Sequence, residues 1–224
     1  MAKMSLDKEW LIILHSLPVL AEGALVTLVL SFAAMAGALF LGLAITIVRV
    51  FKIRSLDRTV RLYVSFFRGT PLLVQLLILY FGLTTFHIIL TPSTAALLGL
   101  SLHFSAYISE IFRATVLSIN RGQWEAAFSL GMTKVQTLRH IILPQAMRIS
   151  IPPLWNSFID VLKSSSLASV ITVPELTRQI EEQSAAHFIF MPYFITLALF
   201  YWVMVVGMSQ IQSWLEEKMH IPGM

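Results

Sequence analysis

Long stretches of this chain carry no charged residue. None occurs from Gly23 to Val48, and none lies between Arg68 and Glu110, where the polar segment Leu83 to Ser93 divides the run. An apolar stretch of about 20 residues is long enough to cross a bilayer as a helix. Only 12% of the 224 residues are charged, whereas soluble domains average roughly 25%. The sequence therefore predicts an all-α integral membrane protein.

We expect five transmembrane helices, which are the spans at residues 23–48, 62–83, 93–116, 149–167 and 188–214. The fourth contains two prolines and the polar residues Asn156, Asp160 and Lys163, which only a helix surrounded by other helices tolerates. Residues 1–22 include an apolar run that is too short to span, and we expect an external amphipathic segment there. Residues 216–224 are expected to form a tail.

Lys and Arg residues are distributed unevenly between the segments that join these spans. Eleven follow the first span, lie at the end of the third span or after it, or lie in the tail, whereas only Lys3, Lys8 and Arg178 lie in the other segments. The positive-inside rule then predicts a cytoplasmic loop at residues 121–148, a cytoplasmic C-terminus and an external N-terminus. The basic residues are dispersed among apolar runs, so nucleic acid is not an expected partner.

The loop at residues 121–148 predicts a helix–turn–helix outside the membrane. Gly131 suits a left-handed turn after the first helix, where we expect Glu125 at the helix start. Thr133 and Gln136 have the spacing of a capping box that begins a second helix. Pro144 predicts that this second helix ends at Leu143.

The same loop resembles the EAA loop of bacterial ABC-importer permeases, which has EAA, three residues, Gly, nine residues, Ile, one residue and Leu-Pro. The matching residues are Glu125, Ala126, Ala127, Gly131, Ile141, Leu143 and Pro144. The resemblance implies the type I ABC importer permease fold, in which such loops form cytoplasmic coupling helices that dock on a separate ATPase. An ordinary amphipathic hairpin that binds nothing is the alternative for this loop.

Three further runs resemble the polar amino-acid subfamily of these permeases: RGTPLLVQ at 68–75, AYISEIFRATVLSI at 106–119 and NSFIDVLKSSSL at 156–167. The resemblance implies a subunit of the bacterial cytoplasmic membrane that carries a polar amino acid of the histidine, glutamine, arginine or cystine type. It also implies an ATPase dimer that binds ATP and Mg²⁺, a second permease subunit and a solute-binding protein. Three serines follow Lys163, where the subfamily often has LLKxTSL, which leaves the ligand open.

Two groups of polar residues are candidates for the substrate path. Asn156, Asp160, Lys163 and Ser164 share one face of the fourth span. Charged groups inside a membrane are paired or line a polar cavity, so a self-contained Asp160–Lys163 pair is the alternative. Arg68, Gly69 and Thr70 precede Pro71, which opens a helix and frees backbone groups. Snorkelling of Arg68 to the membrane surface is the alternative there.

The chain has no phosphate-binding G-x-x-x-x-G-K-[ST] motif, so we expect no catalysis and no cofactor in this polypeptide. It has no cysteine, and we expect no metal site. A permease for another small solute, an ATP-independent channel or ion-coupled carrier, and a membrane scaffold remain alternatives. Gly37 and Gly42 lie among alanines in the first span, which predicts close helix packing there.

Overall fold

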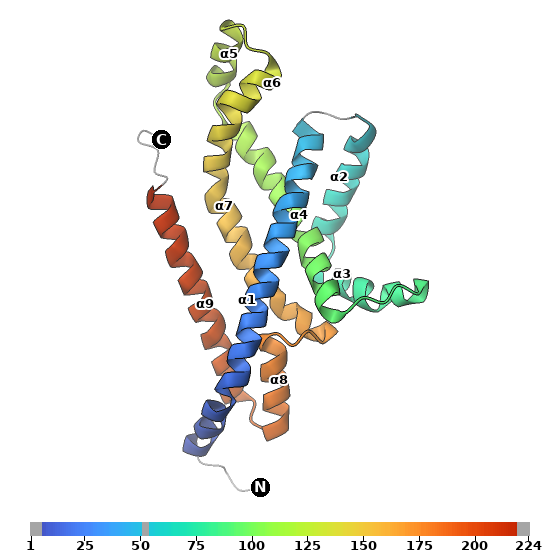
Figure 1. Ribbon diagram of the computed structural model, residues 1–224, viewed down its shortest axis with the longest axis vertical. Coiled ribbons are helices and arrows are strands. Elements are labelled where there is room, and N and C mark those ends of the chain that lie inside the picture. The colour runs from blue at the N-terminus through green and yellow to red at the C-terminus, as the bar shows by residue number, and fades with distance from the viewer. Residues whose placement is uncertain (1–5, 51–53, 219–224) are drawn as a thin grey trace.

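The computed structural model describes residues 6–50 and 54–218, and this part of the chain is helical and contains no strand (Figure 1). Its elements in chain order are α1 (Leu6–Val50), α2 (Arg54–Gly69), α3 (Leu72–Tyr80), η1 (Gly82–Phe86), α4 (Pro92–Ser118), α5 (Arg121–Ser129), α6 (Lys134–Thr137), η2 (Leu138–Ile142), α7 (Leu143–Ser164), η3 (Ser165–Ile171), α8 (Leu176–His187) and α9 (Met191–Lys218).

Helix α1 is a single helix of 45 residues, so no break in the helix marks the expected boundary between an N-terminal segment and the first span. At 1.5 Å per residue it is about 68 Å long, roughly twice the hydrocarbon thickness of a bilayer. The first turns of α1 pack on the rest of the protein, because Ile13 and Leu20 are buried against α8 and α9. The hydroxyls of Ser16 and Tyr193 also hydrogen-bond at 2.8 Å. Residues 1–5 lie outside the described part of the chain.

Helices α1 and α4 pack closely along a line of small residues. A Cβ atom at Gly37 would lie 2.6 Å from the Ser101 hydroxyl, and one at Gly42 would lie 2.7 Å from Ile108. The Ser101 hydroxyl donates to the carbonyl of Ala34 across this contact at 3.2 Å. The close packing expected from the glycines is therefore present, and its partner is α4.

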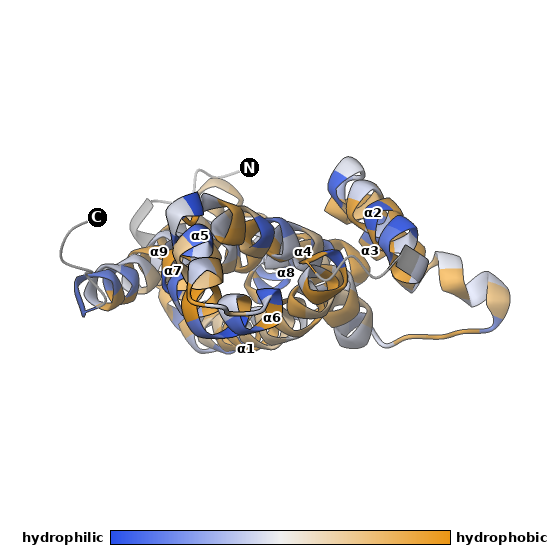
Figure 2. Ribbon diagram, turned by 90° about the horizontal axis from the view of Figure 1, so that it is seen from above, coloured by the Kyte–Doolittle hydropathy of each residue, from blue (hydrophilic) through white to orange (hydrophobic). Residues whose placement is uncertain are grey.

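The expected second span is not one straight helix. Helix α2 ends at Gly69, and the segment that begins at Leu72 runs at 106° to it. Pro71 lacks an N–H and does not continue α2, which explains where the break falls. Seen from above, α2 and α3 lie to one side of the bundle formed by α1, α4, α7 and α9 (Figure 2).

Three helices, α1, α4 and α9, are long and apolar enough to cross a membrane, and the bent α2–α3 pair is a fourth candidate. Helix α7 is not among them by composition because it carries the polar residues of the expected fourth span. The 3₁₀ helix η3 and the helix α8 follow it, and the sequence had left both of these elements unassigned. The chain is thus a multi-pass membrane protein, and a count of five requires that α7 also crosses.

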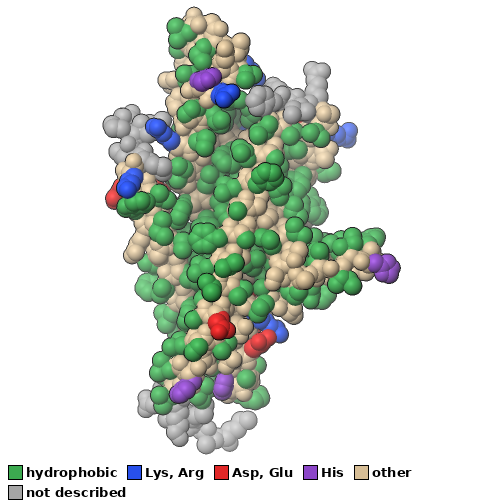
Figure 3. All heavy atoms as spheres, in the orientation of Figure 1, with side chains coloured by type: hydrophobic (Ala, Val, Ile, Leu, Met, Phe, Trp, Pro, Cys, Tyr) green, Lys and Arg blue, Asp and Glu red, His purple; other side chains and the backbone are tan. Residues whose placement is uncertain are grey.

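The two ends of the bundle differ in their side chains. The C-terminal ends of α1, α4 and α9 lie together with α5 and α6 at one end, and the start of α1 and α8 lie at the other (Figure 1). On the face shown in Figure 3, hydrophobic side chains cover the middle, and Lys and Arg gather toward the end with α5 and α6. The folded chain therefore brings the two basic loops of the sequence to a common end.

A substitution at Gly42 tests the α1–α4 contact. We expect Gly42→Ala to lower the free energy of unfolding by about 1–3 kcal/mol, because its new methyl group would crowd Ile108 and the Ser105 carbonyl. Gly207→Ala is the matched control, since no atom lies within 4 Å of its Cβ position. Thermal unfolding of both variants in one detergent measures the difference. Equal melting temperatures would contradict the role given to the glycine.

Candidate functional site

The end of α5 forms a tight turn whose carbonyl groups are satisfied by backbone N–H groups. The N–H of Met132 donates to the carbonyl of Ala127 at 3.1 Å, and the N–H of Gly131 donates to that of Phe128 at 2.9 Å. This is the Schellman arrangement, which needs a left-handed residue. Gly131 supplies it with φ = 78°. The expected left-handed glycine turn is therefore confirmed.

Helix α6 begins with the expected capping box. The N–H of Gln136 donates to Oγ1 of Thr133 at 3.3 Å, and the N–H of Thr133 donates to Oε1 of Gln136 at 2.8 Å. The turn after α5 and the capping box of α6 thus both use groups within a few residues of the backbone groups that they satisfy. This local origin explains why the sequence predicts them.

The second helix does not end at Leu143, contrary to expectation. A π-helical turn, η2, follows α6, and the N–H of Leu143 donates to the carbonyl of Leu138, five residues back. Pro144 has no N–H to donate, and its ring would meet the carbonyl four residues back in a regular helix. The wider π turn removes this conflict. The backbone therefore continues in helical conformation from the loop into α7.

The residues of the EAA pattern are divided between packing and exposure. Ala127 is buried, and Ile141 packs on the cluster of Ile119, Leu138, Ile142 and Ala146 at the base of the loop. The remaining members are exposed: Glu125, Ala126, Gly131, Leu143 and Pro144.

Two details of the EAA pattern differ from expectation. Glu125 is the fifth residue of α5, one turn beyond the helix start, so its carboxylate is too far in to stabilise the N-terminal dipole as expected. Ala126 is exposed and does not allow a close approach of helices within this chain, whereas Ala127 does.

The loop also exposes large apolar side chains that the sequence analysis had not singled out. Phe128 is 47% exposed, Leu130 is 82% exposed and Val135 is 56% exposed. Beside them lies a hollow of about 670 Å³, whose lining includes Glu125 and Phe128. Exposed apolar groups of this kind around a charged hollow are typical of a surface that a protein partner covers. In the sequence, this surface is indicated only by the positions of these three apolar residues within a polar loop.

The polar residues expected on one face of the fourth span do lie together on α7. The ammonium group of Lys163 is 2.8 Å from the Asp160 carboxylate, and these side chains are 55% and 59% exposed in the single chain. About one turn earlier on α7, the side-chain amide oxygen of Asn156 accepts a hydrogen bond from Nε2 of Gln212 on α9 at 3.3 Å. The Asp160–Lys163 pair is therefore present and exposed in the single chain, and a role of Asp160 in the substrate path stays a prediction. Ser164 ends α7 and is half-buried.

The bend after α2 is stabilised by Gln75, which sequence reasoning had missed. Its side chain is 3% exposed. Its amide nitrogen donates to the carbonyl of Phe67 at 3.1 Å and to Oγ1 of Thr70 at 2.8 Å. Its amide oxygen lies 3.1 Å from Nδ1 of His103 on α4 and accepts from it. Carbonyls freed by Pro71 are thus satisfied inside the protein, as a membrane requires.

Arg68 and Gly69 lie at the exposed end of α2, beside this network. The guanidinium of Arg68 lies 5.4 Å from the ring centroid of Tyr107 on α4, a cation–π contact. Nothing lies within 4 Å of a Cβ position at Gly69. Among the described residues, no hydrogen bond or ion pair joins this group to the polar face of α7, so the structure places the candidates at two separate positions.

Comparison with known proteins gives consistent results. The family model described as binding-protein-dependent transport system inner membrane component matches residues 38–221. A probable amino-acid ABC transporter permease protein of Vibrio harveyi is 41% identical over 210 residues, which cover 92% of this chain and 94% of the relative. The L-cystine transport system permease protein of Bacillus subtilis is 40% identical over 203 residues, with coverages of 90% and 87%.

A solved structure agrees over almost the full chain. The crystal structure of an amino acid ABC transporter with histidines matches with a TM-score of 0.91 and 35% identity, covering 97% of this chain and 100% of that one. The part that is compared includes the EAA hairpin, which is the loop at residues 121–148, and the bent second span. This chain is therefore a member of the family of inner membrane components of binding-protein-dependent transport systems.

Proposed function

We propose that this chain is the permease subunit of an ABC importer for a polar amino acid. The observation that carries the proposal is the continuous helical path from the exposed EAA hairpin into α7, whose exposed face holds Asp160 and Lys163. Members of this family are membrane components without catalysis of their own. In the proposal, ATP and Mg²⁺ are therefore bound by a partner ATPase dimer.

Coupling to the ATPase would use the surface around the hairpin. Phe128, Leu130 and Val135 offer apolar area, and Glu125 offers a charge to a basic group of the partner. Closure of the ATPase would displace the hairpin as a unit, because its turn and its second helix are both capped internally. The displacement would reach α7 without crossing a flexible loop. This mechanism assigns the EAA residues to coupling and not to the substrate.

The substrate path would lie between two permease subunits. The Asp160–Lys163 pair is more than half exposed in one chain, and a charged pair that faces lipid would be costly. A second permease chain, identical or homologous, would enclose it in a polar path, with α7 as the fifth crossing. A zwitterionic amino acid presents both an ammonium and a carboxylate, which suits a site with one group of each sign. A solute-binding protein would deliver the solute at the N-terminal end.

The class of solute rests on the relatives, whose names specify L-cystine in one case and amino acids in general in the others. We infer a polar amino acid for this chain on that basis. Arg68, Gly69 and Thr70 form a second proposed part of the path, at the bend where α2 stops.

The first prediction concerns topology. We expect reporter fusions to give a cytoplasmic signal at the C-terminus and within residues 121–148, and an external signal at the N-terminus, because the basic loops meet at one end of the bundle. Fusions in the α8 region, at the opposite end, are the internal control. An external signal at the C-terminus would contradict the proposal of five spans.

The second prediction concerns coupling. Apart from its two neighbours, no atom of the described residues lies within 4 Å of a Cβ position at Gly131, so Gly131→Asp should leave the helix bundle folded. We expect it to reduce co-purification of the ATPase and substrate-stimulated hydrolysis at least tenfold, because φ > 0 strains the turn by about 1 kcal/mol or more and the side chain enters the docking surface.

Gly131→Asn is the matched variant, since Asn and Asp adopt the left-handed region about equally well and Asn adds no charge. Loss in both variants would assign the effect to bulk in the docking surface, and loss in the Asp variant alone would assign it to charge. Full retention of the ATPase by both variants would refute the coupling role of this loop.

The third prediction concerns the polar face of α7. We expect Asp160→Asn to abolish or redirect uptake in reconstituted vesicles while ATPase association remains intact, because it removes one sign of charge from the proposed path. Glu182→Gln is the control, since Glu182 forms a similarly exposed pair with Arg178 at 2.7 Å on α8. Equal uptake by the wild type and the Asp160 variant would leave the pair with a structural role only.

A further inference from the structure

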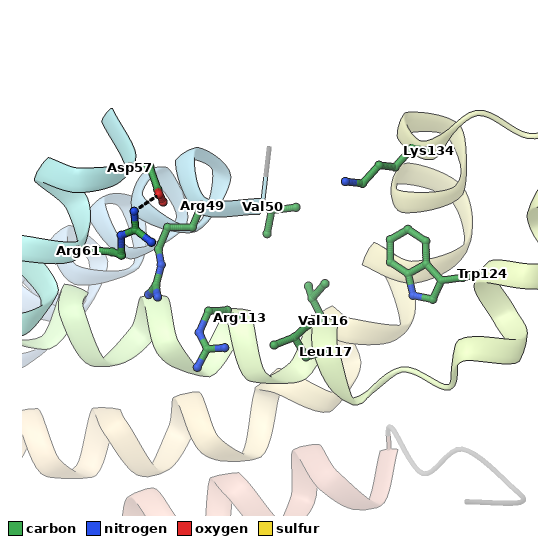
Figure 4. A pocket seen from close by; sticks show the side chains of 9 residues that line it. All are labelled: Arg49, Val50, Asp57, Arg61, Arg113, Val116, Leu117, Trp124 and Lys134. Atoms are coloured by element: carbon green, nitrogen blue, oxygen red, sulfur yellow. Dashed lines mark ion pairs between the residues drawn. The ribbon is translucent and has the colours of Figure 1, made fainter. Parts of the chain in front are cut away.

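A basic hollow opens where α1 and α4 end, beside α2 and the EAA hairpin (Figure 4). Its volume is about 590 Å³. Arg49 and Arg61 face Trp124 and Lys134 across the opening, and Arg113 lies on the α4 wall between them. Four cationic side chains from four separate elements therefore surround one space.

The positive charge in this hollow is only partly neutralised. Asp57 pairs with Arg61 at 2.6 Å. Glu110 pairs with Arg49 and, at 2.7 Å, with Arg113. For Lys134 no ion pair is found among the described residues, so four cations face two carboxylates. The hollow carries an excess of positive charge that an anion would balance.

The excess extends along α2 toward the bend. A second hollow of about 530 Å³ shares Arg49 and Arg61 with the first and adds Arg68. Arg61 and Arg68 are seven residues apart, two turns along one face of α2, which is about 10 Å. Arg68 contributes a further cation, because its only charged or aromatic contact in the described chain is the Tyr107 ring. The positive region therefore extends about 10 Å along α2.

The other walls of the first hollow are apolar. Val116 and Leu117 of α4 and the indole of Trp124 line it next to the arginines. Leu117 is 68% exposed. Trp side chains are common at the membrane interface, where polar headgroups meet hydrocarbon. A wall that combines Trp124 with arginines therefore suits a ligand that is charged in one part and apolar in the rest. A small soluble anion would use the cations alone and leave these side chains in water.

We propose that this hollow is a binding site for an anionic phospholipid. The phosphate would lie among Arg49, Arg61, Arg113 and Lys134, and the start of the acyl chains would lie against Val116, Leu117 and Trp124. Arg49 is in the last turn of α1, directly after the charge-free run from Gly23 to Val48, and in the proposal the cations lie where this hydrocarbon-spanning run ends. Basic pockets between transmembrane helices at this level bind anionic headgroups. Because Trp124 and Lys134 belong to the EAA hairpin, the bound lipid would also contact the coupling loop.

Native mass spectrometry of the full-length chain in detergent tests the proposal, with phosphatidylglycerol and phosphatidylcholine as the two probes. We expect the wild type to bind phosphatidylglycerol in preference. Arg61→Gln should weaken that binding about fivefold, which corresponds to about 1 kcal/mol for one cation near a charged lipid surface. Asp57→Asn should strengthen it, because this change removes a carboxylate from the same wall.

Arg58→Gln is the matched control. Arg58 is exposed on the same helix, three residues from Arg61, and lines neither hollow, so its loss should change nothing. The opposite signs expected for Arg61→Gln and Asp57→Asn distinguish a ligand site from a structural ion pair, whose loss would act alike in both variants. Equal binding of the two lipids, or equal effects of the Arg58 and Arg61 substitutions, would overturn the proposal.

Inorganic phosphate identifies the source of the anion. Bound phosphatidylglycerol should persist when inorganic phosphate is added in excess, because only the lipid uses Val116, Leu117 and Trp124. Displacement of the lipid by inorganic phosphate would overturn the lipid assignment and identify a site for free anions.

Discussion

The close approach of α1 and α4 is the contact on which the rest of the bundle depends. Gly37 and Gly42 bring the two backbones together, and the hydroxyls of Ser101 and Thr46 then bond to carbonyls across the contact. All the other long helices pack on this pair, since α2, α3 and α7 contact α4 while α7, α8 and α9 contact α1. Without a hydrophobic force between helices in lipid, small residues and such hydrogen bonds determine which faces meet. The positions of the bend and of the polar face of α7 follow from this pair.

The same need to satisfy backbone groups explains the least regular part of the fold. Breaking a span at Pro71 frees carbonyls that water cannot reach inside a bilayer. Gln75 replaces the missing donors and is itself held by His103 of α4. A buried amide that bonds to two elements fixes the 106° bend in one orientation. Among the described residues, no buried side-chain nitrogen or oxygen lacks a hydrogen-bond partner, so α3 departs from the bundle without leaving a buried polar side chain unpaired.

The sequence predicts those features that short-range chemistry determines. Gly131, Thr133 and Gln136 act on backbone groups within five residues, so the turn and the capping box could be inferred, as could the charge-free spans and the Asp160–Lys163 spacing. The role of Gln75 depends on His103, which is 28 residues away, and on the angle of the bend, which short-range sequence patterns do not determine. The predicted end of the loop helix at Leu143 was wrong. A proline usually stops a helix, whereas here the π turn η2 accommodates Pro144 and the helix continues. The continuity of α1 was missed because a change from polar to apolar composition does not require a break in a helix.

The continuity through η2 has a mechanical consequence. Pro144 and Asp160 are 16 residues apart on one helical path, a separation of about 24 Å. A loop connection would absorb a displacement of the hairpin, whereas a helix transmits it, and the α7 backbone is anchored along its length on α1 and α4. The π turn lies at the hairpin end of this path, where Ile142 is fully buried, and precedes the first residue of α7. Any flexibility that η2 introduces therefore changes the angle of the hairpin relative to α7 and leaves the spacing of Asn156, Asp160 and Lys163 intact. In the proposed function, the hairpin would adapt its angle to a partner at η2, and the displacement would pass Pro152 and Pro153 inside α7 before it reaches the polar face.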